Sequence, residues 1–224
     1  MTEEEWLDCY NVETLLDVIL DRASSRKMRL LAAAACSAAC TILVQPYSSA
    51  VVEVVERYAD GLASSQELSK AAANAWDVSN RWAVGPEPPL ASAEAFSEFF
   101  QRADTHEALA WAASEEGTTE RDTVAVLSRA LFMLWTSGID LCDFLRDIFG
   151  NPFRPVAFDG RWRTTNVVEL ARTIYDERTF DRLPILADAL LDAGCNNDDI
   201  LSHCRSDGPH VRGCWAVDLV LGKE

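Results

Sequence analysis

The chain has 224 residues, 49% of them hydrophobic and 25% charged, and its 36 acidic and 20 basic residues give a formal net charge of −16. This composition is typical of a folded globular protein and excludes disorder over most of the length. The negative charge disfavours binding to nucleic acid and to anionic membrane surfaces. We therefore expect a protein partner, no nucleic acid and no membrane.

The opening residues, MTEEEWLDCY, predict a cytoplasmic protein, because they are acidic and lack the basic start and apolar core of a signal peptide. The longest apolar run, Leu30–Val44, is interrupted by polar residues and is shorter than the about 20 residues that span a bilayer. It predicts a buried helix. The seven cysteines are odd in number and unevenly spread, which favours reduced thiols over a disulfide framework.

Helix signals follow one another through the first half of the chain. The predicted N-terminal caps are Thr2 with Glu5, Asn11, and Ser64 with Glu67. Together with the apolar spacing they predict helices that cover residues 24 or 25 to about 44, 49–59 and 64 to about 82. Cys36 and Cys40 lie four apart in the first of these, where small side chains favour close helix packing over metal binding.

Three prolines in AVGPEPPLA, residues 83–91, prevent regular helix and mark a linker or a long ordered loop. We expect an N-terminal helical module over residues 1–83, the linker or loop at 84–91, and a C-terminal helical module over 92–224, with one continuous domain as the alternative. The helices predicted after the loop are Ser92–Arg102, Thr105–Glu115, Thr119–Ser137, Ile139–Phe149, Asn166–Asp176, Arg182–Ala193, Asn197–Cys204 and His210–Leu221. The fold class is all-α, with about ten helices in one array or two linked bundles.

The stretch CNNDDILSHCRSDGPHVRGC, residues 195–214, holds three of the seven cysteines and two of the three histidines. Thiolates and imidazoles are ligands that zinc prefers, although no pair has the Cys-x2-Cys spacing of strong zinc motifs. On the predicted last helix, His210 and Cys214 are four apart and share one face. The candidate metal ligands are Cys195, His203, Cys204, His210 and Cys214. The alternative is that the cysteines fill small core spaces and the histidines bond to loop carbonyls.

A second candidate site is a basic and aromatic island in an otherwise acidic protein. Its anion- or partner-contacting residues are Arg154, Arg161, Trp162 and Arg163. Arginine forks beside aromatic faces can hold a phosphate, a carboxylate or a peptide. The alternative is that the aromatic residues anchor a loop while the arginines pair with nearby carboxylates such as Asp159.

Residues 145–223 resemble the C-terminal module of a bacterial family of uncharacterised proteins, in the stretches LRDIFGNPFRPV, LADALLDAGC, HCR and HVRGCWAVDLVLGK. TEEEWL, SSRKMRLLAAAACSAAC and VERYADGLAS are similar to the opening module of the same group. The resemblance implies no activity, cofactor or catalytic residue.

The chain has none of the common nucleophile, phosphate-loop, dinucleotide or metalloprotease motifs, so an enzyme is not favoured. We expect a non-enzymatic, cytoplasmic protein-interaction or regulatory module without a cofactor. One alternative is a structural zinc-binding module that uses the C-terminal cysteines and histidines. The other is an enzyme that acts on an anionic small molecule through the arginine island.

Overall fold

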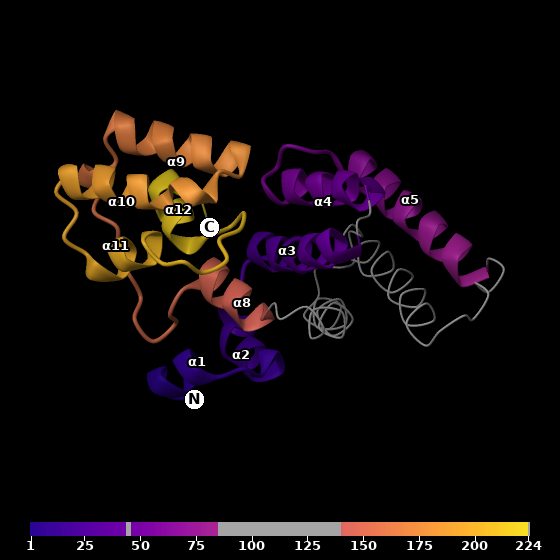
Figure 1. The fold of residues 1–224 in the computed structure, drawn as a ribbon, viewed down its shortest axis with the longest axis horizontal. Helices are drawn as coiled ribbons and strands as arrows, with labels where there is room; N and C mark the ends of the chain where they lie inside the picture. Colours follow the sequence, from indigo (N-terminus) through magenta and orange to yellow (C-terminus); the bar gives the residue numbers. More distant parts are fainter. Residues whose placement is uncertain (44–45, 85–139, 224) are drawn as a thin grey trace. The chain divides into compact units, whose positions relative to one another are not determined.

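The computed structural model describes residues 1–43, 46–84 and 140–223, and within these ranges the protein is helical and contains no strand. Figure 1 shows the helices along the chain. The prediction of an all-α, multi-helical fold is confirmed. Several predictions fall outside the described residues. They are the helices Ser92–Arg102, Thr105–Glu115 and Thr119–Ser137 and nearly all of the linker at 84–91.

The chain divides into two compact units, and one is inserted in the sequence of the other. We call Ser24–Leu141 the inserted unit, and Met1–Ala23 together with Cys142–Glu224 the terminal unit. The domain boundary predicted at residues 84–91 stays a prediction.

In its described residues the inserted unit contains three long helices, α3 (Ser25–Leu43), α4 (Pro46–Ala59) and α5 (Ser65–Val84). Its core joins small side chains of α3, including Cys36, to valines of α4 and alanines of α5, which agrees with a packing role for Cys36. The capping box at Ser64 and Glu67 is present as predicted. Helix α4 begins at Pro46, earlier than predicted, because proline is tolerated in the first turn, where no N–H is needed.

The terminal unit contains seven shorter helices among its described residues. They are α1 (Glu3–Asp8), α2 (Val12–Ile19), α8 (Leu141–Phe149), α9 (Thr165–Glu177), α10 (Leu183–Asp192), α11 (Asp198–Cys204) and α12 (Trp215–Leu221). The predicted caps Thr2 and Asn11 each accept a backbone N–H hydrogen bond at a helix start, and Asn197 does the same at the start of α11. The core of this unit is made by α9 to α12.

The predicted last helix, His210–Leu221, is wrong at its start. The helix begins at Trp215, and Cys214 is its N-cap residue. Gly213 has a φ of 95°, in the left-handed region that cannot continue a right-handed helix. Residues 205–214 therefore form a loop between α11 and α12, and this loop shapes the site described below.

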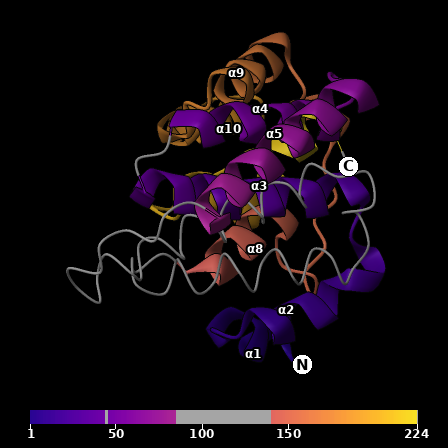
Figure 2. The same cartoon turned by 90° about the vertical axis from the view of Figure 1, so that its right-hand side faces the viewer.

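Helices α1 and α2 lie beside α8, as Figures 1 and 2 show. Trp6 of α1 is fully buried, and Arg146 of α8 donates hydrogen bonds to the carbonyl oxygens of Trp6 and Cys9. The first residues of the chain are thus an integral part of the terminal unit. Among the described residues, no helix combines the length and apolar character that crossing a membrane requires.

Candidate metal centre

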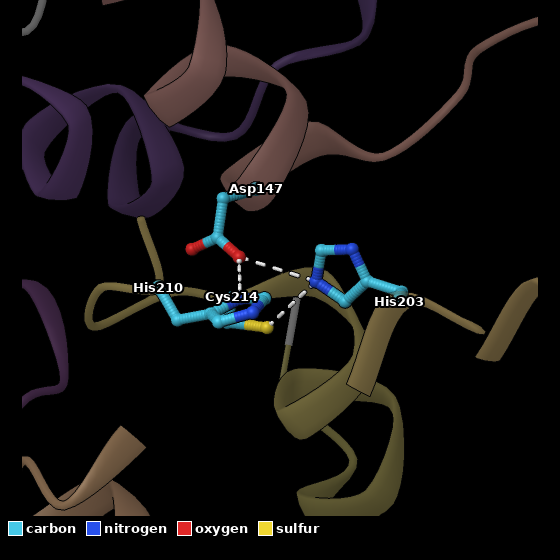
Figure 3. A group of neighbouring side chains, drawn as sticks. All are labelled: Asp147, His203, His210 and Cys214. Atoms are coloured by element: carbon cyan, nitrogen blue, oxygen red, sulfur yellow. Dashed lines mark hydrogen bonds and ion pairs between the residues drawn. The ribbon is translucent and has the colours of Figure 1, made fainter. Parts of the chain in front are cut away.

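Four side chains from separate parts of the terminal unit point toward one another (Figure 3). Asp147 comes from the last turns of α8, His203 from the end of α11, His210 from the following loop, and Cys214 from the cap of α12. One ligand atom from each of the four lies within 4.8 Å of the other three. Carboxylate, imidazole and thiol groups are three common kinds of zinc ligand, so this cluster could hold a metal ion.

Asp147 lies at the centre of the cluster, and its side chain is only 3% exposed. Its Oδ1 is 2.7 Å from His210 Nδ1 and 3.1 Å from His203 Nε2, and its Oδ2 accepts a hydrogen bond of 2.9 Å from the N–H of Val211. Burial opposes ionisation, but the hydrogen bonds and charges of the two histidines outweigh it and keep the pKa of Asp147 below its usual value. The group is therefore a carboxylate in the folded protein.

His210 faces an acceptor at each ring nitrogen. Its Nδ1 meets the Asp147 carboxylate, and its Nε2 is 3.2 Å from the carbonyl oxygen of Ser206. Burial lowers the pKa of His210, but the hydrogen bond and charge of Asp147 outweigh burial and raise it. Without a metal ion, the raised pKa favours a protonated His210 that pairs with Asp147. With one, Nδ1 would offer its lone pair while Nε2–H would keep its hydrogen bond to the Ser206 carbonyl, as in most histidines that bind metals.

Cys214 is fully buried, and its Sγ is 3.2 Å from His203 Nε2. Burial and the nearby Asp147 carboxylate raise the pKa of this thiol well above its usual value, although the backbone N–H groups of Val217 and Ala216 oppose the effect. Cys214 is therefore a neutral thiol unless a cation replaces its proton. A bound metal ion supplies that positive charge.

The ring of Trp215 packs against the ring of His203. The two rings are tilted at 46° with their centroids 4.9 Å apart. The indole also lies against Gly150, where an added Cβ would stand 3.2 Å from Trp215 Cγ. Gly150 has a φ of 69° and directly follows α8, so its lack of a side chain serves both the backbone turn and the approach of the indole.

The arrangement does not suit nucleophilic catalysis by a Cys-His-Asp triad. In such a triad the acid and the nucleophile contact opposite nitrogens of the histidine. Here Asp147 Oδ1 and Cys214 Sγ both contact Nε2 of His203. A reactive cysteine also needs a lowered pKa and some exposure, and Cys214 has neither.

The distances suit a metal ion at the point on which the four ligand atoms converge. In a tetrahedral zinc site the ligand atoms are about 3.3 to 3.6 Å from one another, as follows from zinc–ligand bonds of about 2.0 to 2.3 Å. The contacts of 2.7, 3.1 and 3.2 Å are shorter than this, because they are spacings of hydrogen-bonded pairs. Other ligand atoms of the cluster are up to 4.8 Å apart, so the side chains would have to adjust to bind one ion.

Of the five metal ligands predicted from the sequence, the cluster contains His203, His210 and Cys214. Cys195 and Cys204 are outside the cluster and, like Cys214, belong to the hydrophobic core of the terminal unit, and burial raises the pKa of Cys204 to about 12. The expectation that His210 and Cys214 share a helical face is wrong, because both precede α12. They meet because the loop turns at Gly213.

Asp147 was missed by the sequence analysis. It lies on the helix that was predicted to end at Phe149, three residues after the buried Phe144 and next to the buried Ile148. A carboxylate at the border of an apolar helix face was the available signal. Nothing local connected that carboxylate to two histidines in a distant part of the chain.

The three arginines of the basic and aromatic island bind different partners and do not converge on one site. Arg154 forms ion pairs with Glu3 at 2.8 Å and with Asp199 at 3.2 Å, and Arg161 pairs with Asp159 at 2.6 Å, as the pairing alternative expected. Arg163 donates to the carbonyl oxygens of Leu219 and Val220 at the end of α12, and Trp162 is buried. An anion- or partner-contacting role for these residues stays a prediction.

No family model matches the chain, and searches of curated proteins and of solved structures find no match. The resemblance of residues 145–223 to a bacterial module therefore stays a prediction.

Proposed function

We propose that the terminal unit is a zinc-stabilised helical module, in which Asp147, His203, His210 and Cys214 hold one structural ion. The observation that carries the proposal is the meeting of four ligand atoms within 4.8 Å, supplied by α8, α11, the loop and the cap of α12. A buried polar cluster of this kind is costly unless its groups are fully satisfied. A cation satisfies all four at once.

The ligand set favours zinc over other common ions. Magnesium and calcium prefer sites built of oxygen atoms, and iron–sulfur clusters are held mainly by several thiolates. One thiolate, two imidazoles and one carboxylate match the borderline character of zinc, with cobalt as a spectroscopic substitute. Four protein ligands also fill a tetrahedral coordination sphere. Such a closed site is structural, since a catalytic zinc keeps one position for water or substrate.

The ion would add a polar link among α8, α11 and α12, and the last two helices already share the apolar core of the terminal unit. Helices α11 and α12 have seven residues each, and the loop between them is mostly exposed from Arg205 to Pro209. Short helices gain most of their stability from tertiary contacts. A metal ion that bridges α8, α11 and the start of α12 supplies those contacts at one point, so that part of its binding free energy becomes folding free energy.

The first test is the zinc content of the full chain purified without chelator, together with Cys214→Ala and Cys195→Ala. Both thiols are fully buried, so both substitutions leave a similar space in the core. Only Cys214 belongs to the cluster. We expect about one zinc per chain in the wild type and in Cys195→Ala, and loss of zinc in Cys214→Ala.

Circular dichroism of each variant separates a lost ligand from a lost fold. A folded wild-type chain that takes up no zinc would overturn the proposal. A folded Cys214→Ala variant that binds zinc as tightly as the wild type would overturn the ligand set. Cobalt gives an independent signal, because the thiolate of Cys214 should produce a sulfur-to-cobalt charge-transfer band that Cys195→Ala retains.

The protein-interaction or regulatory role predicted from the sequence stays a proposal alongside this one. The acidic composition supports a basic or neutral protein partner and disfavours nucleic acid, and a cytoplasmic location agrees with a cluster that needs a reduced thiol. A zinc-stabilised module is compatible with either role, because structural zinc commonly supports interaction domains.

A further inference from the structure

Residues 2–9 contact both helices that supply ligands to the metal centre. The first contact is made by Arg146, which immediately precedes Asp147 on α8. Its Nη2 donates to the carbonyl oxygen of Trp6 at 3.1 Å and also to that of Cys9, and its Nη1 pairs with Asp143 at 3.2 Å. The guanidinium therefore holds the end of α1 while the next side chain points into the cluster.

The second contact runs through Glu3. Its carboxylate pairs with Arg154 at 2.8 Å and accepts a hydrogen bond of 2.8 Å from Asn151. Arg154 also pairs with Asp199, in the first turn of α11, at 3.2 Å. Helix α11 ends with His203 and Cys204, so the segment is linked to the second ligand-bearing helix as well.

Burial strengthens this attachment. The indole of Trp6 is fully buried, whereas Leu7 and Tyr10 beside it are exposed. Displacement of residues 2–9 would therefore expose a large aromatic side chain and leave the guanidinium of Arg146 without the two carbonyls it bonds to. The docked position depends on where α8 and α11 lie with respect to each other.

We infer that zinc binding at the cluster and docking of residues 2–9 are thermodynamically coupled, so that the ion stabilises the docked segment and loss of the ion makes its release more frequent. The inference rests on the proposed zinc site. Because a short helix moves as a rigid body, the position of α8 that brings Asp147 toward His203 is also the position that brings Arg146 to Trp6. Each event stabilises the arrangement that the other requires, and the coupling is reciprocal.

The consequence is a metal-dependent switch. Zinc would stabilise the state in which Trp6 is covered, and its loss would raise the population of a state in which this acidic segment and its tryptophan are exposed. Control of the exposure of this segment by zinc is a physical mechanism for the predicted regulatory role.

Hydrogen–deuterium exchange of the full wild-type chain, with zinc and after chelation, tests the coupling without any substitution. We expect amides of residues 3–9 to exchange at least about fivefold faster without zinc, the lower end of typical coupling. Peptides from α4 in the inserted unit are the internal control and should not change. Equal exchange of residues 3–9 in the two states, in a protein shown to bind zinc, would overturn the inference and leave the zinc site intact.

A pair of variants tests the reciprocal effect. Arg146→Met keeps most of the side-chain length and removes the guanidinium, and we expect its zinc dissociation constant to rise by about 5- to 150-fold, measured with a competing chelator. Arg172→Met, on the exposed face of α9, is the control and should bind zinc as the wild type does. Equal affinities in the two variants would also overturn the inference. A wild type that binds no zinc would instead remove the proposed function, and the coupling with it.

Discussion

The two units of the chain are stabilised by different means. The described part of the inserted unit has three helices of 19, 14 and 20 residues, and small apolar side chains of all three pack in one core. The terminal unit has helices of six to 13 residues, and beside its apolar core it contains a cluster of four ligand-type side chains. Long amphipathic helices bury a continuous apolar stripe, whereas short helices depend more on specific tertiary links.

The largest expected effect is confined to the terminal unit. Asp147→Ala removes the carboxylate that contacts both histidines and the N–H of Val211, and it leaves these groups buried without it. We expect a loss of about 3 to 5 kcal/mol in the free energy of unfolding, even in chelator, as for other broken buried pairs. Denaturant unfolding followed by circular dichroism measures it.

Asp143→Ala is the matched control on the same helix. Its carboxylate is 49% exposed and forms an ion pair with Arg146, so we expect a loss of at most about 1 kcal/mol. A similar loss in both variants would contradict the view that the cluster supports the terminal unit.

The second effect is a pH dependence of the metal-free protein. The folded-state pKa of Asp147 is lowered, so its contribution is present above the ordinary carboxyl pKa of 3.8 and is lost as pH falls through the folded value. The folded-state pKa of His210 is raised, so its contribution is present below the ordinary value of 6.5 and is lost as pH rises through the folded value. The metal-free protein should therefore be most stable at pH values above the ordinary pKa of 3.8 for Asp147 and below the ordinary pKa of 6.5 for His210.

Unfolding free energies measured against pH in chelator would show this maximum. In His210→Gln, the fall in unfolding free energy on the alkaline side of the maximum should disappear. The zinc-loaded protein should lack the alkaline loss, because the ion replaces the proton. A metal-free wild type whose stability does not fall above neutral pH would contradict the assignment of a protonated His210.

The smallest effect compares two glycines with the same backbone geometry. Gly61 in the inserted unit and Gly150 in the terminal unit have φ values of 71° and 69°. Gly61→Ala meets open space and should cost only the backbone strain of about 1 to 2 kcal/mol. Gly150→Ala carries the same strain and also presses on Trp215 at 3.2 Å, so it should cost more and weaken zinc binding through His203.

Thermal unfolding and zinc titration of the two variants make the comparison. Equal destabilisation with unchanged zinc affinity would show that Trp215 does not position His203.

The sequence predicted the helical fold well because its signals are local. The caps at Thr2, Asn11 and Asn197 lie next to the backbone groups they satisfy, so the chain itself shows them. The start of the last helix was missed because Gly213 is compatible with a helix in sequence, and only the structure shows its left-handed conformation. Three of the cluster residues were found by composition, since histidine and cysteine are concentrated near the C-terminal end.

The remaining part of the site could not be predicted from local patterns. Asp147 meets the histidines through tertiary packing of α8 on the C-terminal loop, and apolar periodicity carries no information on that contact. Cys195 and Cys204 were predicted as ligands on residue type alone. Their place in the apolar core reflects the other common role of cysteine, as a small buried side chain.

The most direct test of the central claim is X-ray absorption spectroscopy at the zinc edge of the loaded full chain. We predict a first shell of one sulfur at about 2.3 Å and three nitrogen or oxygen atoms at about 2.0 to 2.2 Å, which corresponds to Cys214 with His203, His210 and Asp147. A shell with two or more sulfur atoms would bring Cys195 or Cys204 into the site, and a shell without sulfur would exclude Cys214. Either result would contradict the metal centre described here.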